Sequence, residues 1–252
     1  MRILIKIGSA LLSKNNKFNL ELLAKKVSEI STLKKNNEII IITSGAVASG
    51  MENEKIKDRP KETLELQLLS GEGQVILMKN YQQLFEKENI RVAQVLLTHH
   101  NFDKEDEKIA IMKILNSYLK KGIISIINEN DLISKEEIDS KLFTDNDILA
   151  ALVSIGLKVD LAVILTDVNG LYDSDPKVNP NPKLIEEVIE INENVKRLAG
   201  KPNNLGLGGM ISKITAAEMM NKEGINVIIA NGNLNLSDII ENKVKRTLFK
   251  VI

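Results

Sequence analysis

Lys6 is the one charged residue within the apolar run Ile3–Ile7. An unpaired buried ammonium group is costly, so this lysine needs an anion unless it extends to solvent from an edge strand. Gly8 and Ser9 follow directly, and main-chain N–H groups at such a turn can approach a phosphate. Lys6, Gly8 and Ser9 are therefore candidate phosphate-binding residues.

A second candidate phosphate loop is the segment G-L-G-G-M-I-S-K at 206–213. It is not a Walker A loop, because Ser212 precedes Lys213 and Ile214 follows it, and it is not a dinucleotide fingerprint, which would need glycine at Ile211. What remains is a glycine turn that enters a helix with Lys213 in about its first turn. This arrangement suits a polyphosphate, and a loop–helix junction with a solvated lysine is the alternative.

Carboxylates and amides cluster in two further segments, Asn128–Asp131 after a predicted strand and Thr144–Asp147 before a predicted helix. The short D-N-D of Asp145–Asp147 lacks the glycine and final glutamate of a calcium loop. Such side chains suit the ammonium and polar groups of an amino acid, although Asp145 or Asn146 could simply cap the helix.

The segment T-S-G-A-V-A-S-G, Thr43–Gly50, leads from a predicted strand into small residues that can begin a helix. Ser44 is expected to cap this helix. The free N–H groups and the positive dipole of the same helix end can bind a carboxylate. A cap and a ligand site can coexist here.

Several classes of function are excluded by composition. The 252 residues include no cysteine, which excludes disulfides and cysteine nucleophiles, and the adjacent His99 and His100 have no further ligands at metal spacing. A formal net charge of +0 and 3% aromatic residues disfavour nucleic-acid binding. No apolar run approaches the roughly 18 residues of a membrane span, and the N-terminus is not a signal peptide. We therefore expect a cytoplasmic protein with neither a nucleic-acid nor a membrane partner.

The elements that must position these groups follow from the hydrophobic pattern. Short continuous β-branched runs predict strands buried on both faces, at Ile3–Ile7, Ile39–Ile42, Val92–Leu97, Ile123–Ile127, Leu161–Leu165 and Val227–Ala230. Segments with helical apolar spacing lie between them, at Leu20–Leu33, Glu62–Glu88, Glu105–Leu119, Asp147–Leu157 and Met210–Asn221. This alternation predicts a three-layer α/β/α sandwich with a central, mostly parallel sheet. The polar groups should then meet at the carboxyl ends of the strands, where Thr166 and Asp167 also lie.

Taken together, these segments resemble the amino acid kinase family over essentially the whole chain. The matching motifs are I-K-I-G-S at Ile5–Ser9, T-S-G-A-V-A-S-G at Thr43–Gly50, I-N-E-N-D at Ile127–Asp131, D-N-D at Asp145–Asp147, L-T-D-V-N-G-L-Y-x-x-D-P at Leu165–Pro176 and G-L-G-G-M-x-x-K at Gly206–Lys213. T-S-G-A with I-N-E-N-D and D-N-D points to members that phosphorylate glutamate. The resemblance implies a single kinase domain over 1–252, with an amino-acid-binding lobe at about 1–160, a nucleotide-binding lobe at about 161–252 and no C-terminal RNA-modification-type (PUA) domain.

The implied reaction transfers phosphate from ATP, with Mg²⁺, to the side-chain carboxylate of L-glutamate, giving L-glutamyl 5-phosphate, the first step of proline biosynthesis. By resemblance, Lys6 and Lys213 stabilise the phosphoryl group and Asp147 orients their ammonium groups. The implied glutamate-binding residues are Ser44, Gly45, Asn128, Asp131, Asp145 and Asn146. The implied ATP-binding residues are Lys6, Gly8, Ser9, Thr166, Asp167, Gly208, Gly209, Met210 and Lys213. Mg²⁺ would be carried mainly by ATP oxygens and water, with no metal ligand from the chain.

Rival functions stay open at this point. Sister kinases act on N-acetylglutamate, aspartate, carbamate or a nucleoside monophosphate, and a non-catalytic nucleotide-binding protein is a further alternative. The retention of both Lys6 and Lys213 argues against the non-catalytic alternative, because ATP can be bound without two converging cations. The resemblance also implies inhibition by L-proline and assembly into a homo-oligomer, either a dimer or a tetramer.

Overall fold

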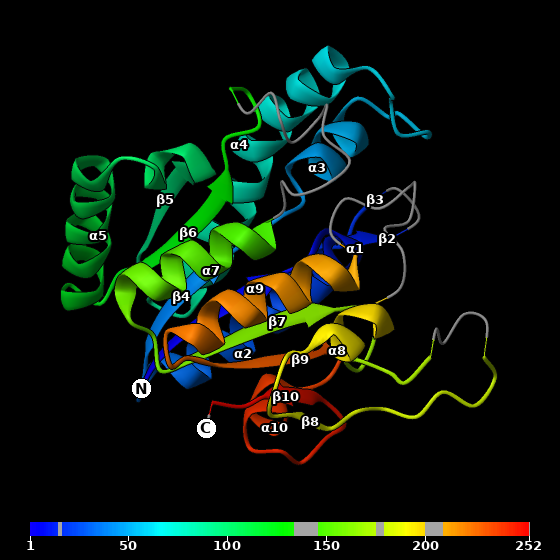
Figure 1. Cartoon of the computed structure of the whole chain (residues 1–252). Helices are drawn as coiled ribbons and strands as arrows, with labels where there is room; N and C mark the ends of the chain where they lie inside the picture. Colours follow the sequence, from blue (N-terminus) through cyan, green and yellow to red (C-terminus); the bar gives the residue numbers. More distant parts are fainter. Residues whose placement is uncertain (15–16, 134–145, 175–178, 200–208, 252) are drawn as a thin grey trace.

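The computed structural model describes residues 1–14, 17–133, 146–174, 179–199 and 209–251 (Figure 1). Its centre is an eight-stranded sheet with the order β5-β6-β4-β1-β7-β9-β10-β8. The strands are β1 (Arg2–Ile7), β4 (Glu38–Ile42), β5 (Val92–Leu97), β6 (Ile124–Glu129), β7 (Leu161–Thr166), β8 (Glu187–Val188), β9 (Asn226–Asn231) and β10 (Thr247–Phe249). A separate short hairpin pairs β2 (Ser13–Lys14) with β3 (Lys17–Phe18).

From β5 to β9 every neighbouring pair of strands is parallel, whereas β10 is antiparallel to β9 and parallel to β8. β1 is central, since Ile5 lies beside Ile41 of β4 on one edge and Val163 of β7 on the other. Strands covered on both faces need apolar side chains at every position, which explains their continuous β-branched sequences.

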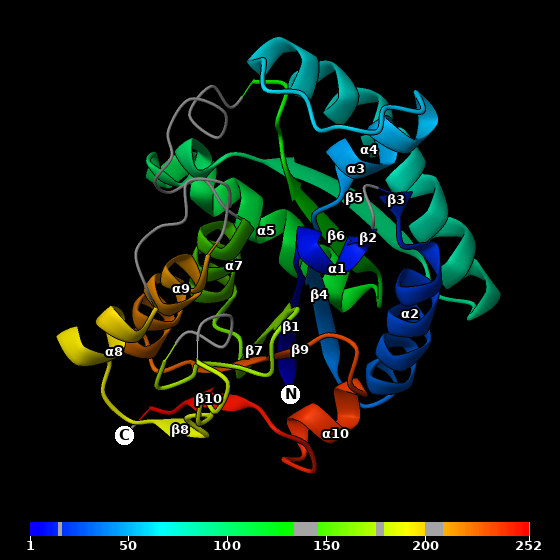
Figure 2. The ribbon, with the colours of Figure 1, turned by 90° about the vertical axis from the view of Figure 1, so that its right-hand side faces the viewer.

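The helices form two outer layers. They are α1 (Ser9–Leu12), α2 (Leu20–Lys34), α3 (Ala46–Asn53), α4 (Thr63–Lys87), α5 (Glu105–Lys120), α7 (Asn146–Leu157), α8 (Glu193–Leu198), α9 (Met210–Lys222) and α10 (Leu236–Ile240), with the 3-10 helix η1 (His99–Phe102). Figure 2 shows α5, α7 and α9 on one side of the sheet and α2, α4 and α10 on the other.

Alternate strand residues enter two separate hydrophobic cores. Leu4 belongs to the core under α5, α7 and α9, while its neighbours Ile3 and Ile5 belong to the core under α2, α4 and α10. All three side chains have no exposed surface. The sheet is therefore the middle of three layers, with a packed core on each face.

The predicted fold class is confirmed, and each of the six apolar runs forms a strand while each of the five periodic segments forms a helix. The antiparallel strand β10 was not predicted, because Thr247–Phe249 is too short to give a periodic signal. Within the described ranges, none of the helices combines the length and the apolar character needed to span a bilayer.

Candidate active site

Asp147 lies between Lys6 and Lys213 in the interior of the molecule. Lys6 Nζ is 2.7 Å from Asp147 Oδ1, and Lys213 Nζ is 3.0 Å from Asp147 Oδ2. Asp147 has no exposed surface, and the lysines are 2% and 5% exposed. Lys6 therefore does not extend to solvent from an edge strand, and Lys213 is not a solvated lysine at a loop–helix junction. Two cations from distant parts of the sequence thus converge on one carboxylate.

The carboxyl group of Asp147 is held in its ionised form. Burial by itself would raise its pKa, but the positive charges of Lys213 and Lys6 outweigh burial and lower the pKa below the usual range. The hydroxyl of Ser212 adds a hydrogen bond of 2.8 Å to Oδ2. Ser212 was not predicted as a site residue, although its place beside Lys213 in the first turn of α9 was a signal for it.

The local structure explains why the ammonium groups meet. Lys6 is the penultimate residue of β1, and Gly8 N donates to Leu165 O (3.3 Å), which places the Gly8 turn beside the end of β7. A Cβ at Gly8 would lie 3.8 Å from Lys6 Nζ, so the lysine head is next to the turn. Lys213 comes from the first turn of α9, as predicted, and Asp147 from the first turn of α7.

A chain of amide hydrogen bonds extends from Asn146, the neighbour of Asp147. Asn146 Nδ2 donates to Ser44 Oγ (2.9 Å) and to Asn128 Oδ1 (3.1 Å), and Asn128 Nδ2 donates in turn to Gln74 Oε1 (2.8 Å). The main-chain N–H of Glu129 donates to Asn146 Oδ1 (3.3 Å). The predicted residues Ser44, Asn128 and Asn146 are thus brought together, and all are buried.

Asp131 lies near this chain and is bound from α4. The hydroxyl of Ser70 donates to Asp131 Oδ2, and Gln67 Nε2 donates to the main-chain oxygen of Asp131 (3.3 Å). Ser70 and Gln74 are one helical turn apart, so the same face of α4 contacts both Asp131 and Asn128. The contribution of α4 was not predicted, because the sequence alone does not show that Ser70 and Gln74 are buried.

The cap of α3 corrects the expectation for Ser44. The N-cap residue is Gly45, with a φ of 105° that favours glycine, and among the residues that the structure describes no side chain caps the helix. The Ser44 hydroxyl instead accepts a hydrogen bond from Asn146. The first N–H groups of α3 are therefore left without a side-chain cap, beside the amide chain.

The predicted nucleotide-binding residues lie at the same edge of the sheet. Ser9 begins α1, and Thr166 and Asp167 come at the end of β7, where Thr166 Oγ1 donates to Asp167 Oδ1 (3.1 Å). Gly209 is the N-cap of α9 and Met210 its first residue. Two predicted residues, Asp145 and Gly208, lie outside the described residues.

Among the side chains that the structure describes, no three His, Asp or Glu residues are grouped so that they could hold a metal ion. The carboxylate nearest the two lysines, Asp147, is engaged by them and by Ser212. This donor set fits a Mg²⁺ ion that is held mainly by nucleotide oxygens and water.

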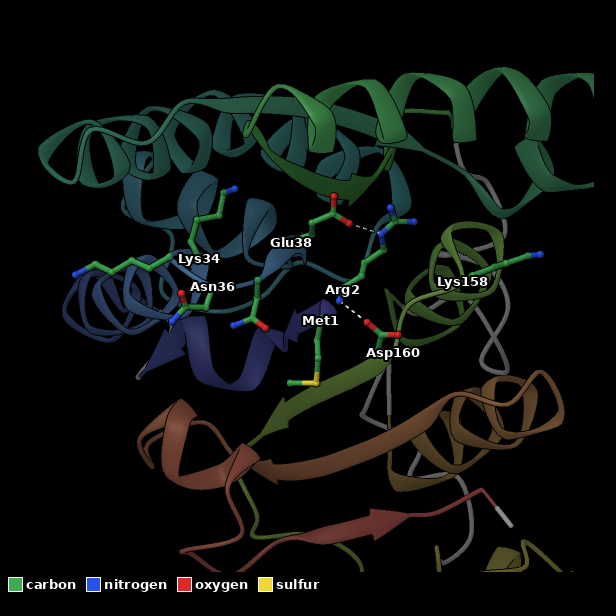
Figure 3. Close-up of a pocket in the computed structure, with 9 residues that line it drawn as sticks. Met1, Arg2, Lys34, Asn36, Glu38, Lys158 and Asp160 are labelled. Carbon is green, nitrogen blue, oxygen red and sulfur yellow. Dashed lines mark hydrogen bonds and ion pairs between the residues drawn. The ribbon is translucent and has the colours of Figure 1, made fainter.

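One pocket, of about 660 Å³, lies at the opposite end of the sheet, where β1 and β4 begin (Figure 3). In this pocket Arg2 Nε is 2.8 Å from Glu38 Oε2, and Arg2 N donates to Asp160 Oδ2 (2.6 Å). None of the predicted site residues lines this pocket.

The model of the amino acid kinase family matches residues 1–231. Glutamate 5-kinase of Clostridium acetobutylicum is 36% identical over 255 residues, which cover 98% of this chain and 94% of that protein. Glutamate 5-kinase of Thermoanaerobacter sp. (strain X514) is 38% identical over 238 residues, covering 93% of this chain and 63% of that protein. The chain thus spans less than two thirds of the latter relative.

Solved structures with the same fold are more distant in sequence. UMP kinase from Ureaplasma parvum superimposes with a TM-score of 0.65 at 17% identity, covering 99% of this chain and 98% of that one. Isopentenyl phosphate kinase superimposes with a TM-score of 0.69 at 16% identity, covering 99% of this chain and 100% of that one. At these identities the likeness concerns the fold alone.

Proposed function

Since this chain belongs to the amino acid kinase family, we propose that it transfers the γ-phosphoryl group of ATP to the side-chain carboxylate of L-glutamate. The products are ADP and L-glutamyl 5-phosphate. The observation that carries this proposal is the buried Lys6–Asp147–Lys213 cluster next to the amide chain of Ser44, Asn128 and Asn146. The similarity to glutamate 5-kinases supports the choice of acceptor.

The reaction needs little acid–base catalysis. A glutamate side chain with a pKa of about 4.3 is already an anion at neutral pH, so no group must remove a proton. The obstacle is repulsion between this carboxylate and the γ-phosphate. Lys6 and Lys213 supply positive charge where negative charge develops on the transferring group, and Asp147 holds both ammonium groups in place.

Glutamate is proposed to bind beside the amide chain. The carboxylate of Asp131 suits its ammonium group, and the uncapped N–H groups of α3 at Gly45 suit its α-carboxylate. Ser44, Asn128 and Asn146 supply further hydrogen-bonding groups, and Asp145 belongs to the same proposed site. The amino-acid-binding lobe is accordingly proposed to span about residues 1–160.

The nucleotide is proposed to bind over the ends of β1 and β7 and the start of α9, within a lobe of about residues 161–252 that meets the Gly8 turn. Gly8, Ser9, Thr166, Asp167 and the segment Gly208–Lys213 are the proposed contacts. Mg²⁺, when bound with ATP, neutralises part of the phosphate charge, and no residue of the chain is assigned to it as a ligand.

The test is ADP release from Mg·ATP with L-glutamate, L-aspartate, N-acetyl-L-glutamate, carbamate and UMP offered singly, with hydroxylamine present to trap an acyl phosphate. Turnover with glutamate alone, accompanied by hydroxamate, supports the proposal. Turnover with another acceptor identifies that acceptor, and not glutamate, as the substrate. Tight ATP binding without any turnover supports a non-catalytic protein.

Two properties of the family are proposed for this chain on the strength of the resemblance. L-Proline is proposed to inhibit the reaction, which the same assay tests with increasing proline at subsaturating glutamate. The chain is proposed to form a dimer or tetramer, which sedimentation velocity tests directly.

A further inference from the structure

Gln74 carries a buried donor that the described structure leaves unused. Its side chain is 8% exposed, and Nε2 is fully buried without a hydrogen-bond partner among the described residues. A buried amide donor without an acceptor destabilises the folded protein. An apolar side chain would fill the same space without that cost, so packing alone does not explain a glutamine here.

The other end of the same amide is fixed in the candidate site. Gln74 Oε1 accepts from Asn128 Nδ2 (2.8 Å), which leaves Nε2 as the free end of the chain that begins at Asn146. The chain therefore runs from the neighbour of Asp147 toward α4 and ends in a donor.

The backbone of α4 is unusually close to the start of α3 at this point. A Cβ on Gly73 would overlap the main-chain oxygen of Ala46, and a Cβ on Gly50 would overlap the main-chain oxygen of Leu69. Gln74 thus follows a residue that touches the first turn of α3, the helix whose N-terminal N–H groups lack a side-chain cap. One turn before it, Ser70 binds Asp131.

We propose that Gln74 binds the substrate, with Nε2 donating a hydrogen bond to the α-carboxylate of glutamate; this assignment rests on the proposed function. The γ-carboxylate must meet the phosphoryl group at Lys6 and Lys213, whereas Gln74 lies at the far end of the amide chain. The α-carboxylate and the ammonium group share one carbon atom, and the face of α4 that carries Gln74 also holds Asp131, the proposed ammonium partner. A hydrogen-bond donor therefore lies on the side of the site where the α-carboxylate is proposed to bind.

The experiment compares Gln74→Leu and Gln74→Met with Gln82→Leu, which changes an exposed glutamine of the same helix. The acceptors are L-glutamate and its α-amide, L-isoglutamine, which keeps the reacting carboxylate but lacks the α-carboxylate. Loss of a hydrogen bond to a charged group is expected to raise KM for glutamate roughly 10- to 100-fold, with kcat and KM for ATP within about threefold of wild type. The preference of the wild type for glutamate over isoglutamine should shrink by a similar factor.

Other outcomes overturn the assignment. A KM for glutamate that stays within about twofold of wild type in folded variants excludes the contact, and an equal loss with glutamate and isoglutamine indicates a structural role instead. Gln74→Met keeps an unbranched chain of similar length, so it serves if the leucine variant does not fold. A wild-type chain that gives no hydroxamate from glutamate overturns the proposed function as well, whereas an active wild type with unaffected variants overturns the Gln74 assignment alone.

Discussion

Lys6 and Lys213 contact different oxygens of one buried carboxylate, Lys6 at Oδ1 and Lys213 at Oδ2 of Asp147. Two ammonium groups held this close repel one another, and the aspartate offsets that repulsion. Both ammonium groups thus bring positive charge to one point in the interior of the molecule. The arrangement suits a phosphoryl group that approaches both cations.

Replacement of Lys213 by alanine is expected to lower kcat roughly 100- to 1,000-fold and to change KM for glutamate by less than about threefold, since the lysine is proposed to act on the transferring group. Steady-state kinetics with Mg·ATP and glutamate measure both constants. Lys222→Ala is the matched control, because Lys222 lies at the end of the same helix with a side chain that is 70% exposed. An unchanged kcat would remove Lys213 from the mechanism.

Asp147→Asn should destabilise the protein in the absence of nucleotide. Two buried lysines lose their counter-charge, and removal of one partner from a buried ion pair costs about 3–5 kcal/mol. Chemical denaturation measures this loss, with Asp103→Asn as the control because the Asp103 side chain is 68% exposed. Mg·ATP is expected to recover part of the loss, since phosphate oxygens replace the missing charge. A variant as stable as wild type contradicts the counter-charge role.

The stability that Asp147 provides should decrease as the pH falls. Its pKa is lowered in the folded protein, so the unfolded chain takes up the proton first as the pH falls. The contribution is fully present well above the unfolded pKa of about 3.9 and is lost as the pH falls below it toward the folded value. The difference in unfolding free energy between wild type and Asp147→Asn should therefore shrink from pH 6 to pH 3. A difference that stays constant over this range would be inconsistent with a lowered pKa.

Asp131→Asn is expected to raise KM for glutamate roughly 10- to 100-fold, because a charge-assisted hydrogen bond to the ammonium group is lost. KM for ATP should change little, and initial rates at varied glutamate and ATP separate the two. Ser70→Ala removes only the hydroxyl that binds Asp131 and should give a smaller rise. Normal glutamate affinity in Asp131→Asn would exclude it from the ammonium site.

Gly73→Ala should move α4 away from α3, because the added Cβ would overlap the main-chain oxygen of Ala46. Overpacking of this kind costs about 1–3 kcal/mol, which corresponds to a fall in Tm of roughly 2–12 °C for a chain of this size. KM for glutamate should rise more than KM for ATP, since α4 carries Ser70 and Gln74. Gly122→Ala is the control. Gly122 has a φ of 67° and open space around it, so this variant measures the effect of replacing a glycine away from the site. Equal KM changes for both substrates would show that α4 does not serve the glutamate site.

Much of the fold was predictable because a strand that is buried on both faces has a continuous run of apolar residues. Ile39–Ile42 and Leu161–Leu165 are such runs, and both form parallel strands beside β1. Thr247–Phe249 gave no comparable signal, since an antiparallel strand of three residues near the edge of a sheet needs no long apolar run. Its place next to β9 depends on tertiary pairing alone.

Site residues were predictable where a charged residue occurs in a sequence context that does not usually contain one. Lys6 lies in an apolar strand and Lys213 follows a glycine turn, and the structure brings both to Asp147. Ser70 and Gln74 gave a weaker signal, because polar residues on a long amphipathic helix are usually exposed. Their burial becomes evident only from the way in which α4 packs on α3.

The central position of β1 also affects how the protein is made. β1 leaves the ribosome long before its partner β7, which ends only at Thr166. At about 5–20 residues per second, the edge of β1 that β7 will cover stays open for roughly 8–30 s of synthesis. Pairings of such large sequence separation fold slowly and leave apolar strand edges open to aggregation. Lys6 is therefore translated long before Asp147, the residue that it contacts in the folded protein.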